Sequence, residues 1–171
     1  MPSKTIQHLI HEHREVEKAF QPLELLLKPE AAARPEELAD AFAGFVPTFA
    51  DRVLPHLHKE QEILFPALEG FLPRDIGPLA VLRGEHNDLQ EMFEHLQRSS
   101  ASLKDSGGKS EVVEGFLREA RALATLMHDH IYKEEQVLFP VVERFISGVR
   151  DAYLIRQMEG FRAGTGSLEV A

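Results

Sequence analysis

Six side chains able to bind a metal ion occupy positions where a helical protein would otherwise bury an apolar residue. Two of them are glutamates that each follow a histidine by four residues, and residues four apart project from the same helix face. Two further histidines stand at single positions of two other apolar stripes. Burying such groups unpaired is costly, so a cation between them is the simplest explanation. The six candidate metal ligands are His13, His56, Glu60, His86, His130 and Glu134.

The sequence around these residues is an internal repeat. Residues 53–71 (VLPHLHKEQEILFPALEGF) align with residues 127–145 (MHDHIYKEEQVLFPVVERF) at an offset of 74, and the histidine, the glutamate and a Leu-Phe-Pro run are identical in both. The dipeptide Glu-His at residues 12–13 recurs at residues 85–86, an offset of 73. The chain therefore contains two copies of one helix pair, although repetition alone could serve packing.

The repeat also predicts how the ligands divide between two metal ions. One ion would lie between His13 and His56 and the other between His86 and His130, with the two glutamates bridging them. Imidazole and carboxylate suit several transition metals, and two bridging carboxylates with open positions favour iron. The chain has no cysteine, which excludes thiolate sites. The expected cofactor is two iron ions, with zinc or manganese as the alternatives.

A competing pair, His58 and Glu62, has the same spacing of four residues. The repeat places Tyr132 and Gln136 opposite them, so the pair is not preserved and this register is rejected. Other histidines are expected on the solvated surface or turned away from the ligands. They are His8, His11, His95 and His128.

Three side chains beside the candidate ligands keep alternative roles. Glu135 adjoins Glu134 and could supply the oxygen in its place if the helix were distorted. Glu17 and Gln90 each stand one helical turn after a stripe histidine. There they could be labile ligands, outer hydrogen-bonding groups or ordinary solvated residues.

Helices must position all of these groups, because apolar residues recur three and four apart along nearly the whole chain. Stretches rich in proline, glycine or serine divide the pattern at residues 28–35, 70–78 and 99–110, which predicts four helices. Four amphipathic helices joined by short loops bury their stripes as an up-down antiparallel bundle. The expected fold is all-α, with an internal twofold repeat of a helix pair and a short C-terminal helix around Tyr153.

Prolines complicate the second helix. Pro47 and Pro55 each remove a helical hydrogen bond, so we expect a kinked helix or a break near Pro47. The apolar stripes of the second and fourth helices are expected to continue beyond the glutamates. Their last members are predicted to be Ile63, Ala67, Val137 and Val141.

Length and charge limit the domain organisation and the function classes. The 171 residues can bury one core, so we expect a bundle at residues 1–146 and a C-terminal helix or tail at residues 147–171. The net charge of −9 argues against nucleic acid and membrane partners. The sequence has no bilayer-length apolar run, and its first fifteen residues lack the pattern of a signal peptide, so a cytoplasmic location is expected. It does not indicate an oligomeric state.

The pattern resembles the hemerythrin-like, or HHE cation-binding, family over residues 6–145. The motif His-x3-Glu-x3-Leu-Phe-Pro carries the resemblance at residues 56–66 and 130–140, together with the two Glu-His dipeptides. The resemblance implies an up-down four-helix bundle with a non-haem di-iron centre. In that family histidines bind iron, carboxylates bridge, and the true carriers bind dioxygen reversibly.

The sequence departs from the oxygen carriers at two places. They have a second histidine at the position of Gln90, and a five-residue spacing where His130 and Glu134 are four apart. The resemblance therefore implies a more open centre that binds or senses dioxygen, peroxide, nitric oxide or iron itself. The alternatives are a di-iron oxidase or peroxide-removing enzyme and a metal-free helical interaction module, and enzyme status stays open.

Overall fold

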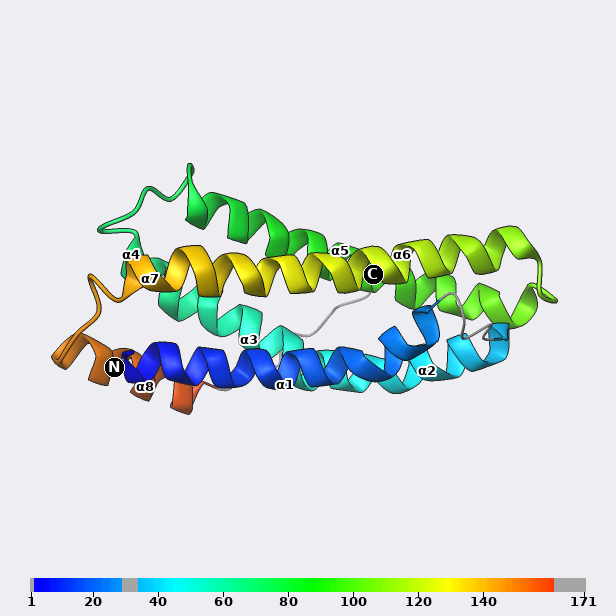
Figure 1. The fold of residues 1–171 in the computed structure, drawn as a ribbon, viewed down its shortest axis with the longest axis horizontal. Helices are drawn as coiled ribbons and strands as arrows, with labels where there is room; N and C mark the ends of the chain where they lie inside the picture. Colours follow the sequence, from blue (N-terminus) through cyan, green and yellow to red (C-terminus); the bar gives the residue numbers. More distant parts are fainter. Residues whose placement is uncertain (1, 29–33, 162–171) are drawn as a thin grey trace, which may run out of the picture.

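The computed structural model describes residues 2–28 and 34–161. Residues 29–33 of the first predicted connection and residues 162–171 of the predicted tail lie outside this description. Within the described residues all regular structure is helical, and four long helical segments run antiparallel along an elongated molecule (Figure 1). The predicted all-α up-down bundle is confirmed. The elements are α1 (Lys4–Leu27), α2 (Pro35–Thr48), η2 (Phe49–Val53), α3 (Leu54–Lys59), η3 (Glu60–Leu64), α4 (Phe65–Leu68), α5 (Pro78–Asp105), α6 (Ser110–Lys133), η4 (Glu134–Leu138), α7 (Phe139–Val142) and α8 (Val149–Gly160).

Two apolar clusters fill the bundle, one toward each end. The first is rich in phenylalanine, and the rings of Phe49 and Phe93 stack at its centre with centroids 3.8 Å apart. On each long helix the stretch between the two clusters carries candidate ligands. On α1, for example, His13 lies between Leu9 of the second cluster and Val16 of the first. The candidate site is therefore a polar layer between two apolar layers. No described helix is long and apolar enough to cross a membrane.

Three wide turns interrupt the second and fourth long helices without ending them. They are the π-helical turns η2, η3 and η4, and each ends two residues before a proline. A proline cannot donate to the carbonyl four residues earlier, and its ring crowds that carbonyl. The wide turn relieves the crowding, and in η3 the N–H of Phe65 donates to the carbonyl of Glu60, five residues back. The three prolines are Pro55, Pro66 and Pro140.

Of the two outcomes expected near Pro47, a break is wrong. Every residue from Pro35 to Leu68 is helical. The helical hydrogen bonding resumes directly after Pro47, because the N–H of Phe49 donates to the carbonyls of the two residues before that proline. The second helix therefore carries its ligands on one continuous segment.

The π-turns also shift the buried face by one residue. The predicted stripe members Ile63 and Val137 are partly or half exposed, and Leu64 and Leu138 are buried in their place. One turn later, Leu68 and Val142 replace the predicted Ala67 and Val141. A π-turn adds one residue to the helical period, so the prediction from a constant period was wrong beyond each glutamate.

The predicted loop at residues 99–110 is too long. Ser99 and Ser100 stay helical, and their hydroxyls donate to the carbonyls three residues earlier at 3.2 and 2.9 Å. Leu103 is fully buried and anchors the last turn of α5. The connection is reduced to residues 106–109, which include two glycines with left-handed φ angles of 58° and 81°.

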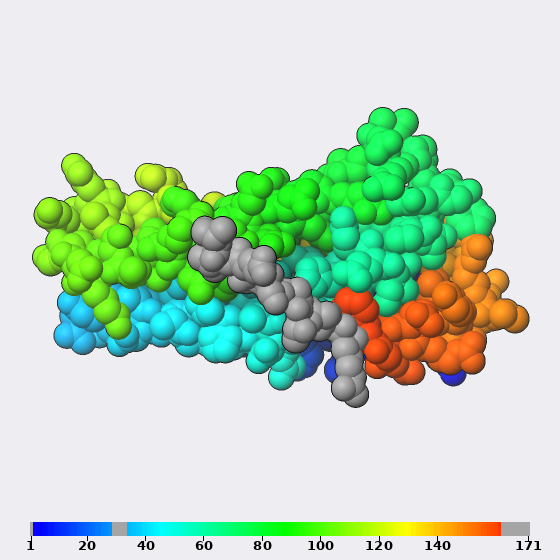
Figure 2. All heavy atoms as spheres, turned by 180° about the vertical axis from the view of Figure 1, so that it is seen from behind, coloured from blue at the N-terminus to red at the C-terminus, as the bar shows by residue number. Residues whose placement is uncertain are grey.

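The short helix α8 packs against α1 and η3 near the end of the bundle that contains the N-terminus, where Figure 2 shows it in orange to red. Leu154 and Met158 are buried in the second apolar cluster. The carboxylate of Asp151 accepts hydrogen bonds from the backbone N–H groups of Lys4 and Thr5, both at 2.9 Å, and so caps α1. The predicted C-terminal helix is confirmed, and it is packed against the bundle.

Candidate metal centre

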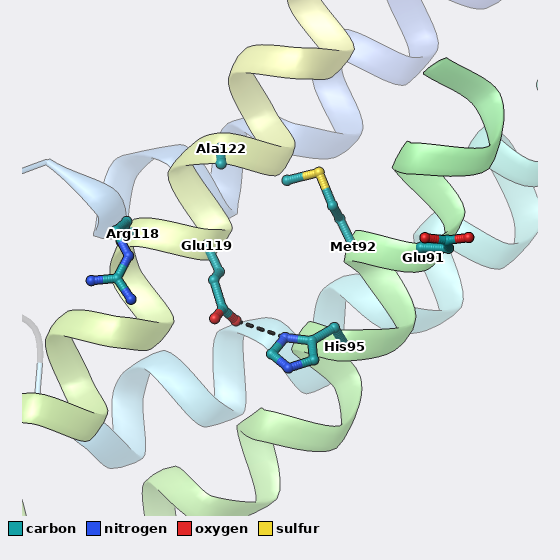
Figure 3. A pocket seen from close by; sticks show the side chains of 6 residues that line it. All are labelled: Glu91, Met92, His95, Arg118, Glu119 and Ala122. Carbon is teal, nitrogen blue, oxygen red and sulfur yellow. Dashed lines mark hydrogen bonds and ion pairs between the residues drawn. The ribbon is translucent and has the colours of Figure 1, made fainter. Parts of the chain in front are cut away.

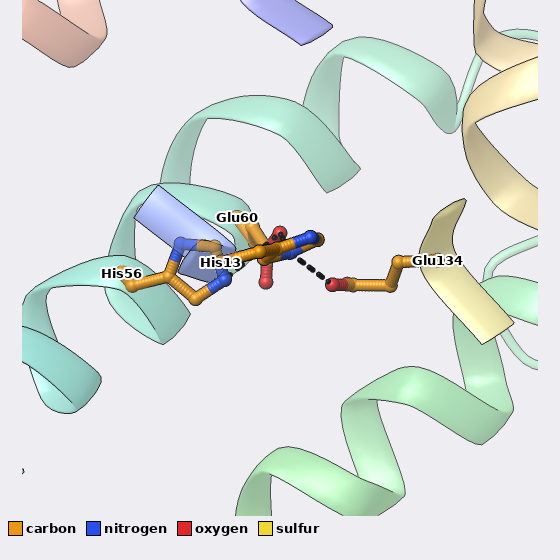
Figure 4. A group of neighbouring side chains, drawn as sticks. All are labelled: His13, His56, Glu60 and Glu134. Atoms are coloured by element: carbon orange, nitrogen blue, oxygen red, sulfur yellow. Dashed lines mark hydrogen bonds and ion pairs between the residues drawn. The ribbon is translucent and has the colours of Figure 1, made fainter. Parts of the chain in front are cut away.

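The six predicted ligands lie together in the polar layer between the apolar clusters. All six side chains are buried, and His86 is the most accessible at 6% exposure. They form two groups of four that share the two glutamates, and within each group the candidate ligand atoms lie within 4.8 Å of one another. Figure 4 shows the group that contains His13 and His56. The other group contains His86 and His130.

Glu60 faces both groups with different oxygens. Its Oε1 atom lies 3.5 Å from Nε2 of His56, and its Oε2 atom lies 3.4 Å from Nε2 of His86. A carboxylate in this orientation can bridge two cations, one on each side.

Glu134 has the same orientation toward the two other histidines. Its Oε2 atom lies 3.1 Å from Nε2 of His13, and its Oε1 atom lies 3.4 Å from Nε2 of His130. In the second group the Nε2 atoms of His86 and His130 are 3.2 Å apart. Two nitrogens bound at about 2.1 Å to one ion, in directions at right angles, would lie about 3 Å apart. The spacing of this histidine pair therefore fits binding to one ion.

Several polar atoms that point into the layer have no hydrogen-bond partner among the described residues. They include both carboxylate oxygens of Glu60, Oε1 of Glu134 and Nε2 of His56. Leaving one such buried group unpaired costs about 1 to 3 kcal/mol. Bound cations would supply partners for all of these atoms, so the residues present fit a metal pair held by nitrogen and oxygen.

Two glutamates hold candidate histidines in position through Nδ1, the ring nitrogen that faces away from the polar layer. The sequence analysis did not assign a role to either glutamate. Glu12 lies 3.2 Å from Nδ1 of His56, and its repeat counterpart Glu85 lies 2.9 Å from Nδ1 of His130. The lysine three residues after each of these histidines pairs with the same glutamate. A carboxylate on Nδ1 fixes the ring so that Nε2 is free for a metal. The signal was present, because both the Glu-His dipeptide and the lysine recur in the repeat.

Glu135 takes the same outer role for a third histidine. Its Oε1 atom lies 2.8 Å from Nδ1 of His13, and both of its oxygens accept from Arg14. It belongs to neither ligand group, although it stood open as a substitute oxygen donor. Glu17 pairs with Arg14 at 2.8 Å, and Gln90 is exposed, so neither lies among the candidate ligands.

The buried histidines and glutamates of the polar layer shift one another's pKa values. Burial alone would raise the pKa of Glu60, but the neighbouring histidines, His56 foremost, hold it well below 4.5. Burial would lower the pKa of His130, but Glu134 and other carboxylates outweigh it and raise the pKa to about 10. The same balance raises the pKa of His13. In the metal-free chain, protons therefore occupy the place of cations, and metal uptake must displace them.

Aromatic rings cover both groups in the same way. Phe139 stacks on His13 with centroids 5.4 Å apart, and Phe65 stacks on His86 at 5.3 Å. Both are the phenylalanine of a Leu-Phe-Pro run. This explains why that run recurs with the ligands: its phenylalanine packs on the ligand ring and its proline follows the π-turn.

The remaining histidines lie outside both groups. His95 is exposed on α5, and its Nδ1 atom lies 2.9 Å from Glu119 of α6 (Figure 3). These two residues line a cavity of about 480 Å³ between the helices, and none of the candidate ligands lines it. The other histidines outside the groups are His8, His11, His58 and His128.

A family model described as Hemerythrin HHE cation binding domain matches residues 4–142. The iron–sulfur cluster repair protein DnrN of Neisseria gonorrhoeae is 28% identical over 144 residues, which cover 79% of this chain and 87% of that protein.

Similar proteins named YtfE match over a shorter stretch. The iron–sulfur cluster repair protein YtfE of Enterobacter sp. (strain 638) is 25% identical over 99 residues, covering 57% of this chain and 45% of that protein. YtfE of Escherichia coli is 28% identical over 86 residues, covering 50% of the chain and 39% of its own length. The match thus spans less than half of these YtfE proteins. No solved structure gives a significant match.

Proposed function

Because the chain belongs to the hemerythrin HHE cation-binding domain family, we propose that it is a non-haem di-iron protein. One observation carries the proposal: the two buried groups of candidate ligands share two glutamates. Each glutamate directs one carboxylate oxygen toward a histidine of the first group and the other oxygen toward a histidine of the second. The proposed iron ligands are His13, His56, Glu60, His86, His130 and Glu134.

Iron suits this donor set, which combines imidazole and carboxylate without thiolate. When bound, an iron pair would supply open coordination positions and electrons for reaction with a small molecule. The proposed small ligand is therefore dioxygen, peroxide or nitric oxide, unless the protein senses iron itself. We propose neither nucleic acid nor a membrane as a partner. A cytoplasmic location stays a prediction.

The chain's own residues prepare the site in two ways. Carboxylates on Nδ1 of three histidines hold the rings with Nε2 directed inward, so that Nε2 is the nitrogen available to a metal. The apolar clusters on both sides keep bulk water out of the layer, which strengthens each electrostatic contact within it.

We further propose that the protein contributes to the upkeep of iron–sulfur clusters. Support comes from the alignment with DnrN, a protein named for iron–sulfur cluster repair, over most of both chains. The chain has no cysteine to hold a cluster by thiolates, so it would act by donating iron or by removing a damaging small molecule. The test is whether iron-loaded protein restores activity to an enzyme whose [4Fe–4S] cluster has been damaged, compared with metal-free protein.

Anaerobic loading with ferrous iron tests the di-iron proposal itself. Elemental analysis should find two iron ions per chain, and oxygen should then produce strong near-ultraviolet absorption that zinc-loaded protein lacks. A chain that retains no transition metal would contradict the proposal and favour the metal-free interaction module.

The same preparation tests the enzyme alternative. Both proposed ions keep open positions, so a peroxide-removing enzyme would consume hydrogen peroxide over many turnovers, and an oxidase would consume dioxygen when given a reducing substrate. Failure of the iron-loaded protein to turn over either peroxide or dioxygen would remove that alternative and leave the binding or sensing role.

A further inference from the structure

The two halves of the candidate centre differ in what covers them. A cavity of about 250 Å³ opens beside His86 and is lined in part by Leu54, Leu57, Gln61 and Asn87. His86 has 6% of its surface exposed, whereas the other three candidate histidines have at most 1%. Of the group that contains His86 and His130, the cavity therefore reaches His86.

An ion-pair cluster stands at the equivalent place in the other repeat. Arg14 donates to Glu17 at 2.8 Å and to both oxygens of Glu135 at 2.8 and 2.9 Å. Glu135 in turn contacts the ring of His13, which has no exposed surface. By the repeat offsets of 73 and 74, the counterparts of Arg14, Glu17 and Glu135 are Asn87, Gln90 and Gln61.

The exchange of charged residues for amides leaves two polar atoms beside the cavity without the contact that their counterparts make. Nδ1 of His86 and Oε1 of Gln61 are buried and have no hydrogen-bond partner among the described residues. Their counterparts in the other repeat, Nδ1 of His13 and Oε1 of Glu135, contact each other at 2.8 Å. A small polar guest beside His86 would thus find a donor and an acceptor. One carboxylate, that of Glu62, also lines the cavity, and it is exposed to solvent, which screens its charge.

We propose that small ligands enter through the cavity beside His86 and bind on the side of His86 and His130, while the Arg14 ion-pair cluster closes the opposite side. This inference rests on the proposed di-iron function. The cavity volume far exceeds the roughly 30 Å³ share of one water molecule, so it admits ligands of two or three heavy atoms. Small molecules can thereby reach only one side of the centre, although the candidate metal ligands are of the same types on both sides.

Azide binding to the oxidised, iron-loaded protein tests the proposal. The double variant Gln61→Glu/Asn87→Arg builds the ion pair of the closed side into the cavity without changing the net charge. It should retain two iron ions by elemental analysis while its azide association rate, followed by absorption, falls at least tenfold. Gln97→Arg is the control for the added cation, because it places an arginine on α5 nearly three turns from Asn87, and its azide association rate should be unchanged.

A second variant tests whether the Arg14 ion-pair cluster closes its side of the centre. Arg14→Asn removes the centre of the ion-pair cluster, so it should open a second route and raise the azide association rate at least twofold. The inference is overturned if azide binds the iron-loaded double variant as fast as the parent, or if the iron-loaded parent binds no azide. A parent chain that takes up no iron would overturn the di-iron proposal instead, and this inference with it.

Discussion

At the scale of single residues, metal binding depends on the hydrogen-bond partner of each candidate histidine as well as on the histidine itself. Three histidines present Nε2 to the polar layer because a carboxylate occupies Nδ1. The fourth, His86, has no such partner among the described residues. Substitutions in the ligands and in the residues behind them should therefore have separable effects on metal binding.

The shared glutamates are the most sensitive positions. Glu134→Gln removes one negative charge and one shared oxygen, so iron content after anaerobic loading should fall from two ions per chain to one or none. Glu119→Gln removes the same charge from the molecular surface of α6 and should retain two ions. Full iron content in the Glu134 variant would argue against a bridging role.

The outer carboxylates should tune affinity without abolishing binding. Glu85→Gln weakens the partner of His130, and the loss of such a partner typically lowers metal affinity by about 10- to 100-fold. Glu12→Gln should do the same through His56. Competition with a chelator of known affinity measures both effects. Unchanged affinities in both variants would show that these carboxylates do not act on the metal.

At the scale of helices, residue type and period account for most of what could be predicted. The four helices and the six buried polar residues follow from apolar spacing, because an amphipathic helix exposes its polar side and buries its stripe. The π-turns do not follow, since a period analysis assumes a constant turn, and so Leu64 and Leu138 were missed. The roles of Glu12 and Glu85 were missed because each stands about 100° around the helix from the ligand beside it.

The cap that α8 places on α1 should stabilise the fold. Asp151→Ala removes hydrogen bonds to the backbone of Lys4 and Thr5, which should lower the free energy of unfolding by about 1 kcal/mol. Chemical denaturation of the metal-free protein at pH 7 measures this. Asp129→Ala, at an exposed position on α6, serves as the control and should have little effect.

The contribution of this cap should depend on pH. Burial alone would raise the pKa of Asp151, but the hydrogen bonds from Thr5 and Lys4 together outweigh it and lower the pKa below 3.8. The stabilisation is therefore full above about pH 4 and is lost as the pH falls through the lowered pKa. The stability difference between the parent and Asp151→Ala should shrink when measured at about pH 3. A constant difference would contradict the role of the ionised carboxylate.

At the scale of the whole molecule, the polar layer joins two apolar blocks, so metal should matter for stability. A ligand that binds only the folded state stabilises it by about 2.7 kcal/mol when its free concentration is about 100 times Kd. Loading with iron should therefore raise Tm by roughly 5 to 10 °C for a chain of this size. Calorimetry of the loaded and metal-free forms measures this, and Glu134→Gln should show a smaller rise.

Protons should substitute for metal in the metal-free protein. The pKa of His130 is raised from 6.5 to about 10, so its stabilisation is full below pH 6.5 and is lost as the pH rises through about 10. The metal-free protein should melt at a lower temperature at pH 10 than at pH 6.5. His130→Gln should show a smaller difference between these pH values, and equal differences in the two proteins would contradict this role.

Because of the internal repeat, each half of the molecule can serve as the control for experiments on the other half. Any substitution near the polar layer has a partner position 73 or 74 residues away, in a setting with the same ligand type and the same stacked phenylalanine. Comparing the two members of such a pair cancels the contribution of ligand chemistry and isolates the contribution of environment. The chain is in effect two tethered helix hairpins, and under our proposal one of them admits small ligands while the other is closed to them.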